Sequence, residues 1–282
     1  MKRASLVAIS LLSVVLFNAP SSGAETTQLL PNLAPLPPEE LLLPGTAFFF
    51  GGPTDVPFTI DGCLIDEKIQ KGAQRCLRFD TSVANSGDGP FEVIYRAETS
   101  GETTAYQRIY SANGSSQSSK VTASEFHPTH LHFHIKDFYI ARLWAAKPNG
   151  RPMGLEPVAT SSKNGFCPED TRTLSGEEEP EHYNCVAYPL RTDSDGATPG
   201  TVVGISSGWM DTYPANLPDQ FIDIKGIVDG AYVLQITIDP NDVFEESNEI
   251  DNTICTLIEI ASEEVTAKFV VPCGRRRSPT SG

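Results

Sequence analysis

The chain has 282 residues, of which 39% are hydrophobic and 20% are charged, and its formal net charge is −15. A composition of this kind can build a hydrophobic core, which excludes a mostly disordered protein. The 36 Asp and Glu residues outnumber the 21 Lys and Arg residues, so the chain would repel a nucleic-acid backbone. We therefore expect no nucleic-acid partner and a cationic partner instead.

The amino terminus has the pattern of a secretory signal peptide. Lys2 and Arg3 precede an apolar run of 14 residues, and small residues follow as far as Ala24. We expect residues 1–24 to be cleaved near Ala24, which would deliver the mature protein to the periplasm or the extracellular space. The run is shorter than the roughly 20 residues that cross a bilayer, and no later stretch is as long, so we expect no membrane span.

The rest of the chain is typical of an all-β protein. Residues 25–60 are rich in Pro and Leu and favour an extended strap packed on the domain along a sheet edge. Short β-branched and aromatic runs bounded by turn residues predict about eight strands, at 76–84, 91–97, 104–110, 130–144, 201–207, 219–225, 230–239 and 253–261. No segment sustains a helical apolar period, so we expect a β-sandwich of antiparallel sheets with little helix. Two long loops (145–162 and 170–200) and a disordered tail (274–282) complete the predicted organisation.

The six cysteines indicate a disulfide framework, because an exported protein folds in an oxidising compartment. They follow one another as three close pairs, and we expect each pair to form a bridge. The predicted bridges are Cys63–Cys76, Cys167–Cys185 and Cys255–Cys273. The alternative is that one or more of these residues are free, buried thiols.

Four of the five histidines lie in one short stretch, His127-Pro-Thr-His130-Leu-His132-Phe-His134. A strand sends alternate side chains to opposite faces, so the last three imidazoles share one face while Leu131, Phe133 and Ile135 point into the core. Three imidazoles without cysteine suit copper, zinc or iron. His127 departs from the alternation and is expected beside the metal ligands or the substrate. The alternative is a polar strand face whose histidines only form hydrogen bonds.

Together with two other segments, the histidine stretch resembles the lysyl oxidase family, whose copper-binding stretch it matches. The segment Lys163-Asn-Gly-Phe-Cys-Pro-Glu-Asp-Thr171 resembles the one around the lysine of the family's quinone cofactor. The segment Asp211-Thr-Tyr213-Pro-Ala-Asn, followed by Gln220-Phe-Ile-Asp-Ile224, is similar to the one that holds the tyrosine of that cofactor. The order of the three segments is also that of the family.

The resemblance implies a copper-dependent amine oxidase. His130, His132 and His134 would bind copper, and Lys163 and Tyr213 would crosslink into lysine tyrosylquinone. The ε-amine of Lys163 can add to the ring only when it is neutral. Such a cofactor uses dioxygen to deaminate primary amines, here peptidyl lysine or small diamines, and yields an aldehyde, ammonia and hydrogen peroxide.

The sequence leaves two carboxylates as candidates for the base that takes a proton from the substrate. Asp137 follows the histidines, but a regular strand would place it on the face opposite to His134, so it would need a bulge to reach the site. Asp211 is the other candidate.

The resemblance extends to residues 230–252 and implies a calcium site. Several hard oxygen donors fall within seven residues there, and calcium takes such donors. In the family an early turn completes this site, and residues 32 and 33 correspond to it. The implied ligands are Glu246, Asn248, Asp251, Asn252, Asn32 and Leu33. The alternative is an ordinary turn whose Asn and Asp side chains cap the backbone.

The chain departs from the animal members of the family at two positions. Thr129 and Thr173 stand where those members have cysteines. The loss of these partners would free Cys167 and Cys185 to pair with each other, in agreement with the bridge predicted above. The protein thus looks like a microbial-style member, with residues 61–273 as the catalytic domain.

Two other functions are left open by the sequence. One is a secreted, non-catalytic β-sandwich that holds copper or zinc through the histidine strand. The other is a hydrolase with a zinc-bound water, for which the sequence offers no identifiable general base. The acidic balance favours the oxidase, because an acidic surface concentrates ammonium groups.

Overall fold

The computed structural model describes residues 26–43, 75–98, 100, 102–127, 132–177, 180–185, 191–192, 199–215, 217, 220–262 and 264–273, and the pairs 64–65 and 68–69. These residues form an antiparallel all-β fold without a helix, as the sequence predicts. Accordingly, this part of the chain has no helix that is long and apolar enough to cross a membrane. The predicted signal peptide and the tail lie outside the described residues.

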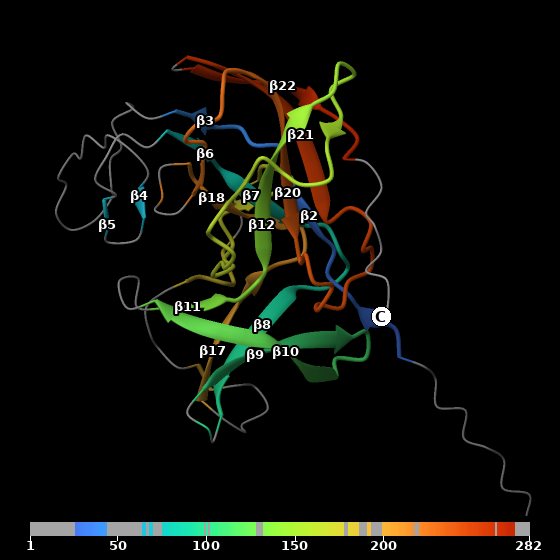
Figure 1. Ribbon diagram of the computed structural model, residues 1–282. Coiled ribbons are helices and arrows are strands. Elements are labelled where there is room, and N and C mark those ends of the chain that lie inside the picture. Colours follow the sequence, from blue (N-terminus) through green and yellow to red (C-terminus); the bar gives the residue numbers. More distant parts are fainter. Residues whose placement is uncertain are drawn as a thin grey trace, which may run out of the picture.

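Seven strands form the larger of two principal sheets, in the lower half of Figure 1. Their order across the sheet is β11, β10, β9, β8, β17 and β16, and β1 also pairs with β9. The strands are β1 (Gln28–Leu29), β8 (Phe91–Ala97), β9 (Thr103–Ser111), β10 (Ser116–His127), β11 (His132–Ile135), β16 (Arg191–Thr192) and β17 (Pro199–Ile205). The histidine stretch therefore lies at one edge of this sheet.

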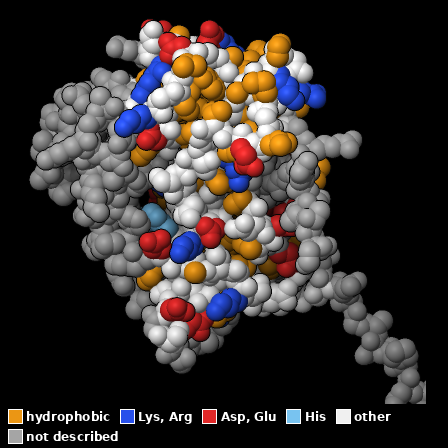
Figure 2. All heavy atoms as spheres, in the orientation of Figure 1, with side chains coloured by type: hydrophobic (Ala, Val, Ile, Leu, Met, Phe, Trp, Pro, Cys, Tyr) orange, Lys and Arg blue, Asp and Glu red, His pale blue; other side chains and the backbone are white. Residues whose placement is uncertain are grey.

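Six strands form the second principal sheet, in the order β13, β12, β20, β21 and β22, with β14 also paired to β12. They are β12 (Tyr139–Ala146), β13 (Pro152–Met153), β14 (Ala159–Thr160), β20 (Gly230–Ile238), β21 (Thr253–Ala261) and β22 (Glu264–Val270). Figure 1 shows β12 and β20 running across the direction of β10 and β11. In the upper part of Figure 2, apolar side chains gather on the surface of the molecule. Phe269 and Val270 of β22 are more than half exposed.

Three smaller sheets complete the described structure. β2 (Leu33–Pro35), β7 (Thr81–Asn85), β15 (Arg172–Thr173) and β18 (Trp209–Tyr213) form the first, in the order β15, β18, β7 and β2. β3 (Leu41–Leu42), β6 (Cys76–Phe79) and β19 (Phe221–Asp223) form the second, and β4 (Leu64–Ile65) pairs with β5 (Lys68–Ile69). Tyr213 thus ends a strand that lies between β15 and β7.

One large core joins the principal sheets. The burial of β12 alternates over its first six residues, because one face of the strand packs inward. Phe91 of β8 stacks on Phe138 with their ring centroids 5.4 Å apart, and Phe244 meets Phe91 edge-on at 5.1 Å. Such aromatic pairs contribute about 1 kcal/mol each beyond the area they bury. This cluster fixes the turn after β11 and the loop after β20 on the same core.

The strand predicted at 130–144 is wrong in one respect, because a turn divides it. Asp137 has a φ of 57° in this turn, a left-handed conformation that Asp tolerates better than most residues. The chain therefore leaves the first sheet after β11 and enters the second as β12. The predicted long loops also differ from expectation, because each contains short strands that pair onto β12, β18 or β17.

The strap crosses the molecule before the first long strand. β2 pairs with β7 at the edge of its sheet, and β1 pairs with β9. Two glycines allow this close approach: a Cβ on Gly87 would lie 2.4 Å from the carbonyl oxygen of Leu30, and one on Gly89 would lie 2.0 Å from that of Leu29. Any larger residue at these positions would displace the strap.

Candidate active site

β11 brings two of the three predicted copper ligands together. The Nε2 atoms of His132 and His134 are 3.0 Å apart, and the centroids of their rings are 5.0 Å apart. Ile135 is fully buried and Phe133 packs against the core, in agreement with the predicted alternation. His130 lies outside the described residues, and so does Leu131.

The separation of the two imidazoles suits two ligands of one metal ion. Metal bonds to imidazole are about 2.0 Å long, so two such ligands at right angles lie about 2.9 Å apart. The observed 3.0 Å between the Nε2 atoms is close to this separation, and it is also the length of a hydrogen bond between the two rings. His134 is buried, whereas His132 is partly exposed. The pair is therefore open to solvent on the side of His132.

The strand pairing of β10 with β11 places two further residues opposite the histidines. The Cα partner of His132 is His127, and that of His134 is Glu125. Residues that are directly opposite in an antiparallel pair are close neighbours on one face of the sheet. The backbone of His127 therefore lies beside the imidazole pair, while its side chain lies outside the described residues. Sequence reasoning gave no signal for Glu125.

The lysine and tyrosine segments meet at one place. The Nζ atom of Lys163 lies 4.5 Å from the centroid of the Tyr213 ring and 5.1 Å from that of Phe166. The rings of Phe166 and Tyr213 are 4.4 Å apart and inclined by 54°. The backbone N–H of Cys167 donates to the Tyr213 hydroxyl at 3.0 Å, and this hydroxyl donates to the Cys167 carbonyl at 2.9 Å. The tyrosine ring is thus fixed in position and in rotation.

Backbone contacts bind the lysine segment to the histidine strand. The N–H of Ile135 donates to the carbonyl of Phe166 at 2.7 Å. A Cβ on Gly165 would lie 2.9 Å from the Ile135 carbonyl oxygen and 3.2 Å from the Cβ of His134. Only glycine fits here without a shift, so Gly165 is a site residue that the sequence alone did not single out. Residues 132–135, 163–167 and 213 therefore form one connected group.

Burial dominates the electrostatics of this group. It raises the pKa of Tyr213 well above its ordinary value, and the charge of Asp211 raises it further. The hydrogen bond from the Cys167 backbone has the opposite and smaller effect. The phenol therefore keeps its proton at neutral pH.

The two candidate bases lie in different surroundings. Asp137 is exposed in the turn after β11, and its carboxylate accepts a hydrogen bond from the side chain of Asn164 at 2.8 Å. Asp211 is 3% exposed and lies two residues before Tyr213 on β18. Burial raises its pKa well above the ordinary value, and the nearby charge of Lys163 lowers it by less. The structure thus places Asp211 on the strand of Tyr213, where the charge of Lys163 acts on it, and keeps Asp137 at the surface.

Disulfides stabilise the site and the second sheet. Cys167 pairs with Cys185 and Cys255 pairs with Cys273, as predicted. Cys76 is also in a disulfide, and its partner lies outside the described residues. The predicted partner, Cys63, is not among the described residues. The first of these bridges anchors Cys167, the residue whose backbone holds the Tyr213 hydroxyl.

The predicted calcium ligands gather where the strap meets the loop after β20. The Leu33 N–H donates to the Glu246 carboxylate at 2.5 Å, and the side chain of Asn32 donates to that of Asp251 at 3.1 Å. Asn252 donates to the other Glu246 oxygen at 2.8 Å. The predicted ligand Asn248 instead closes a local turn by accepting from the N–H of Ile250.

Several oxygens at this place have no hydrogen-bond partner. They are the Oδ1 atoms of Asn32, Asp251 and Asn252, all buried within the part of the chain that the structure describes. Buried polar atoms are nearly always paired, and calcium takes six to eight oxygen ligands. The donor set therefore fits a calcium ion.

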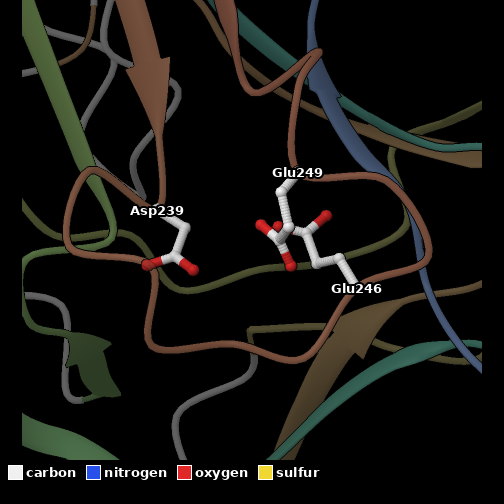
Figure 3. A group of neighbouring side chains, drawn as sticks. All are labelled: Asp239, Glu246 and Glu249. Atoms are coloured by element: carbon white, nitrogen blue, oxygen red, sulfur yellow. The ribbon is translucent and has the colours of Figure 1, made fainter. Parts of the chain in front are cut away.

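Two carboxylates that the sequence did not single out adjoin this set. Figure 3 shows Asp239, Glu246 and Glu249 facing one another, and a carboxylate oxygen of each lies within 4.8 Å of the others. Burial raises the pKa of Glu246 to about 8 and that of Glu249 to about 6, because neighbouring acids and loss of water disfavour their charged forms. Asp239 accepts hydrogen bonds from the N–H groups of Val243 and Phe244, which shape the loop.

The sequence is similar to known proteins of one family. The family described as lysyl oxidase matches residues 108–269. Protein-lysine 6-oxidase of Rattus norvegicus is 30% identical over 131 residues, which are 46% of this chain and 27% of that protein. The Sus scrofa enzyme of the same name is also 30% identical, over 46% of this chain and 44% of its own length. Lysyl oxidase homolog 3 of Homo sapiens is 30% identical over 129 residues, 14% of its length, so the match spans less than half of each relative. Because the family match covers more than half of the sequence and includes the imidazole pair, Lys163 and Tyr213, the chain belongs to the lysyl oxidase family.

Proposed function

We propose that this protein is a secreted, copper-dependent amine oxidase that converts primary amines into aldehydes and releases ammonia and hydrogen peroxide. The observation that carries the proposal is the convergence of an imidazole pair, Lys163 and Tyr213 from three separate segments. The family relationship supports it, because relatives at 30% identity are named protein-lysine 6-oxidases. Export is supported by the pattern of residues 1–24 and by the disulfides, which persist in oxidising compartments.

In this proposal the histidines hold the metal. His132 and His134 supply two neighbouring ligands, and His130 supplies the third. His127, opposite His132 in the strand pairing, orients a ligand or contacts the substrate. Three protein ligands leave a position for dioxygen or water, which a catalytic metal requires.

Lys163 and Tyr213 become the organic cofactor. When bound, copper supplies the redox chemistry with dioxygen by which the two side chains are joined as lysine tyrosylquinone, and that quinone takes electrons from the amine. The chain itself supplies position: the backbone of Cys167 holds the phenol, and the Phe166 ring supports the Lys163 side chain. Reacting groups that are held near each other from the start need little further ordering.

The substrate in this proposal is a cationic amine, either peptidyl lysine or a small diamine. The net charge of −15 attracts ammonium groups over long distances and raises the rate of encounter. Because such attraction is screened by salt, the apparent affinity for a diamine should fall as ionic strength rises.

Calcium in this proposal has a structural role. Its ligands come from the strap and from the loop after β20, so a bound ion would fasten the strap to the second sheet. The ligands are Asn32, Leu33, Glu246, Asp251 and Asn252, with Asn248 in the same loop and with Asp239 and Glu249 as neighbouring charges. This ion would not take part in the oxidation.

The test is a visible spectrum of protein produced with copper and treated with phenylhydrazine, followed by peptide mapping. A coloured product on a peptide that joins Lys163 to Tyr213 is the expected result. The Tyr213→Phe variant should bind copper and stay colourless, and the His132→Ala variant should lose both copper and colour. Copper-loaded wild-type protein that stays colourless, with the two peptides separate, would instead support a metal-binding module without catalysis.

A further inference from the structure

Asp211 has a carboxyl oxygen that its surroundings do not use. The residue is 3% exposed, and its Oδ1 atom has no hydrogen-bond partner in the part of the chain that the structure describes. The backbone N–H of Glu169 bonds to this carboxyl and is the hydrogen bond that lowers its pKa. Leaving a buried polar atom unpaired is unfavourable, and more so if the atom is charged. Such an atom requires an explanation.

A neighbouring carboxylate shows what a purely structural role looks like in this fold. Asp170 is also 3% exposed, but both of its oxygens are paired. They accept the N–H of Ser206 at 2.7 Å, the hydroxyl of Ser206 at 2.8 Å and the N–H groups of His182 and Tyr183 at 3.0 and 3.2 Å. Asp211 differs from this pattern because one of its oxygens is left for another partner.

The position of Asp211 brings its carboxyl group near the segment that begins with Lys163, whose charge acts on it. Asp211 and Tyr213 are two residues apart on β18 and therefore share a face of the strand. The lysine segment runs beside β18: Cys167 bonds to the Tyr213 hydroxyl, Glu169 bonds to the Asp211 carboxyl, and Thr171 bonds to the Met210 carbonyl. At the start of that segment, Lys163 lies over the Tyr213 ring.

Lys163 must lose a proton before it can form a bond to carbon. Its Nζ atom lies over two aromatic rings, and such contacts favour the charged ammonium. An ammonium has no electron pair to donate, so a nearby group has to accept a proton first. The charged and titratable groups that act on the Asp211 carboxyl are Lys163, Glu169 and Asp170, with Tyr213 on the same strand.

We propose that Asp211 is the proton acceptor for Lys163 during formation of the crosslink to Tyr213. The proton moves from Nζ of Lys163 to the unused Oδ1 of Asp211, which leaves a neutral amine and a neutral carboxylic acid, and no electrons are transferred in this step. Burial and the charge of Glu169 raise the pKa of Asp211, so the carboxylate has an unusually high affinity for a proton. The proposal rests on the proposed function, in which copper and dioxygen carry out the oxidation itself.

The Asp211→Asn variant tests this assignment, because it keeps the shape of the side chain and removes its ability to accept a proton. In the full-length, copper-loaded protein at about pH 7, the rate at which the peptide joining Lys163 to Tyr213 appears, measured by mass spectrometry, should fall at least about tenfold. Copper content should stay the same. The difference from wild type should shrink at higher pH, because hydroxide then removes the proton. The Asp223→Asn variant, at an exposed aspartate on β19, is the control and should crosslink at the wild-type rate.

Three results would overturn the proposal. The first is an Asp211→Asn variant that crosslinks as fast as wild type, even if its turnover of amine is slow, because Asp211 would then act only later. The second applies if that variant does not fold: a wild-type crosslinking rate that rises in proportion to the concentration of buffer base at a fixed pH shows that a base from solvent, and not a buried carboxylate, accepts the proton. The third is wild-type protein without any crosslink, which overturns the proposed function as well, whereas the first two leave it intact.

Discussion

The Nζ atom of Lys163 lies 4.5 Å from the centroid of the Tyr213 ring, although the two residues belong to different segments of the chain. The relationship depends on a third residue, Cys167, whose backbone fixes the phenol and whose disulfide to Cys185 fixes that backbone. The lysine segment is in turn bonded to the strand that carries the imidazole pair. A bond between the two side chains would therefore require side-chain rotation and no rearrangement of the sheets.

The Tyr213→Phe variant separates crosslinking from folding. It removes a hydroxyl that makes two hydrogen bonds to the Cys167 backbone, so the free energy of unfolding should fall by about 1–3 kcal/mol. Crosslinking and oxidase activity should be absent, while copper binding persists. Urea unfolding, metal analysis and peptide mapping measure the three quantities. The Tyr232→Phe variant is the control, because it also loses a paired hydroxyl. That hydroxyl donates to the Val228 carbonyl, at a distance from the site. Residual oxidase activity in the Tyr213→Phe variant would contradict the assignment.

The sequence indicated which segments meet, but it missed details of the fold. Alternation along a strand was enough to place Phe133 and Ile135 inward and to bring His132 and His134 together. The meeting of Lys163 and Tyr213 depended on the family resemblance, because a loop lysine and a turn tyrosine carry no local signal of their own. The turn at Asp137 was missed because the residues around it read as one β-rich run, and a single left-handed residue leaves that composition unchanged.

Other features arise from contacts between distant segments and could not be predicted. Asp239 and Glu249 adjoin the calcium ligands only because the loop after β20 turns back on itself, guided by hydrogen bonds to Asp239. Gly165 matters because two backbones approach each other closely there. Glu125 lies opposite His134 only through the register of β10 and β11.

The two described disulfides offer a matched pair of variants. Each bridge joins cysteines that are 18 residues apart, so the loss of either should reduce stability by a similar amount, about 3 kcal/mol in the chain-entropy account. Only the Cys167–Cys185 bridge supports the backbone that holds Tyr213. Replacing both of these cysteines by Ala should therefore also slow crosslinking, whereas replacing Cys255 and Cys273 should not. Thermal unfolding and the yield of the crosslinked peptide compare the two; equal yields would show that the bridge has no role at the site.

Gly87 should control the docking of the strap. In the Gly87→Ala variant the new Cβ would lie 2.4 Å from the Leu30 carbonyl oxygen. The Cβ is bonded directly to the backbone and the oxygen is part of it, so neither atom can move away by side-chain rotation. The strap should move away, which removes the contact of Leu33 with Glu246 and weakens calcium binding. Limited proteolysis of the strap and a calcium titration measure the two effects.

Gly114→Ala is the control for this change. Its φ of +84° makes any side chain unfavourable by about 1 kcal/mol, but nothing lies within 4 Å of the added Cβ. Its strap should therefore resist protease as in wild type. Equal protease sensitivity of the two variants would show that strain in general, and not the contact with the strap, is responsible.

Glu246 should make the stability of the calcium-free protein depend on pH. Its pKa is about 8 in the folded protein and near 4.5 in the unfolded chain, so the folded state binds the proton more tightly. The resulting contribution to stability is complete below about pH 4.5 and is lost as the pH rises toward about 8, a loss on the order of a few kcal/mol. Calcium binds the ionised carboxylate, so the stabilisation by calcium should grow over the same pH range. Urea unfolding in the presence of a chelator or of calcium, at several pH values, measures both trends.

The Glu246→Gln variant should lose the pH dependence and most of the response to calcium, because its amide neither titrates nor carries charge. A response to calcium as large as that of wild type would place the ion elsewhere.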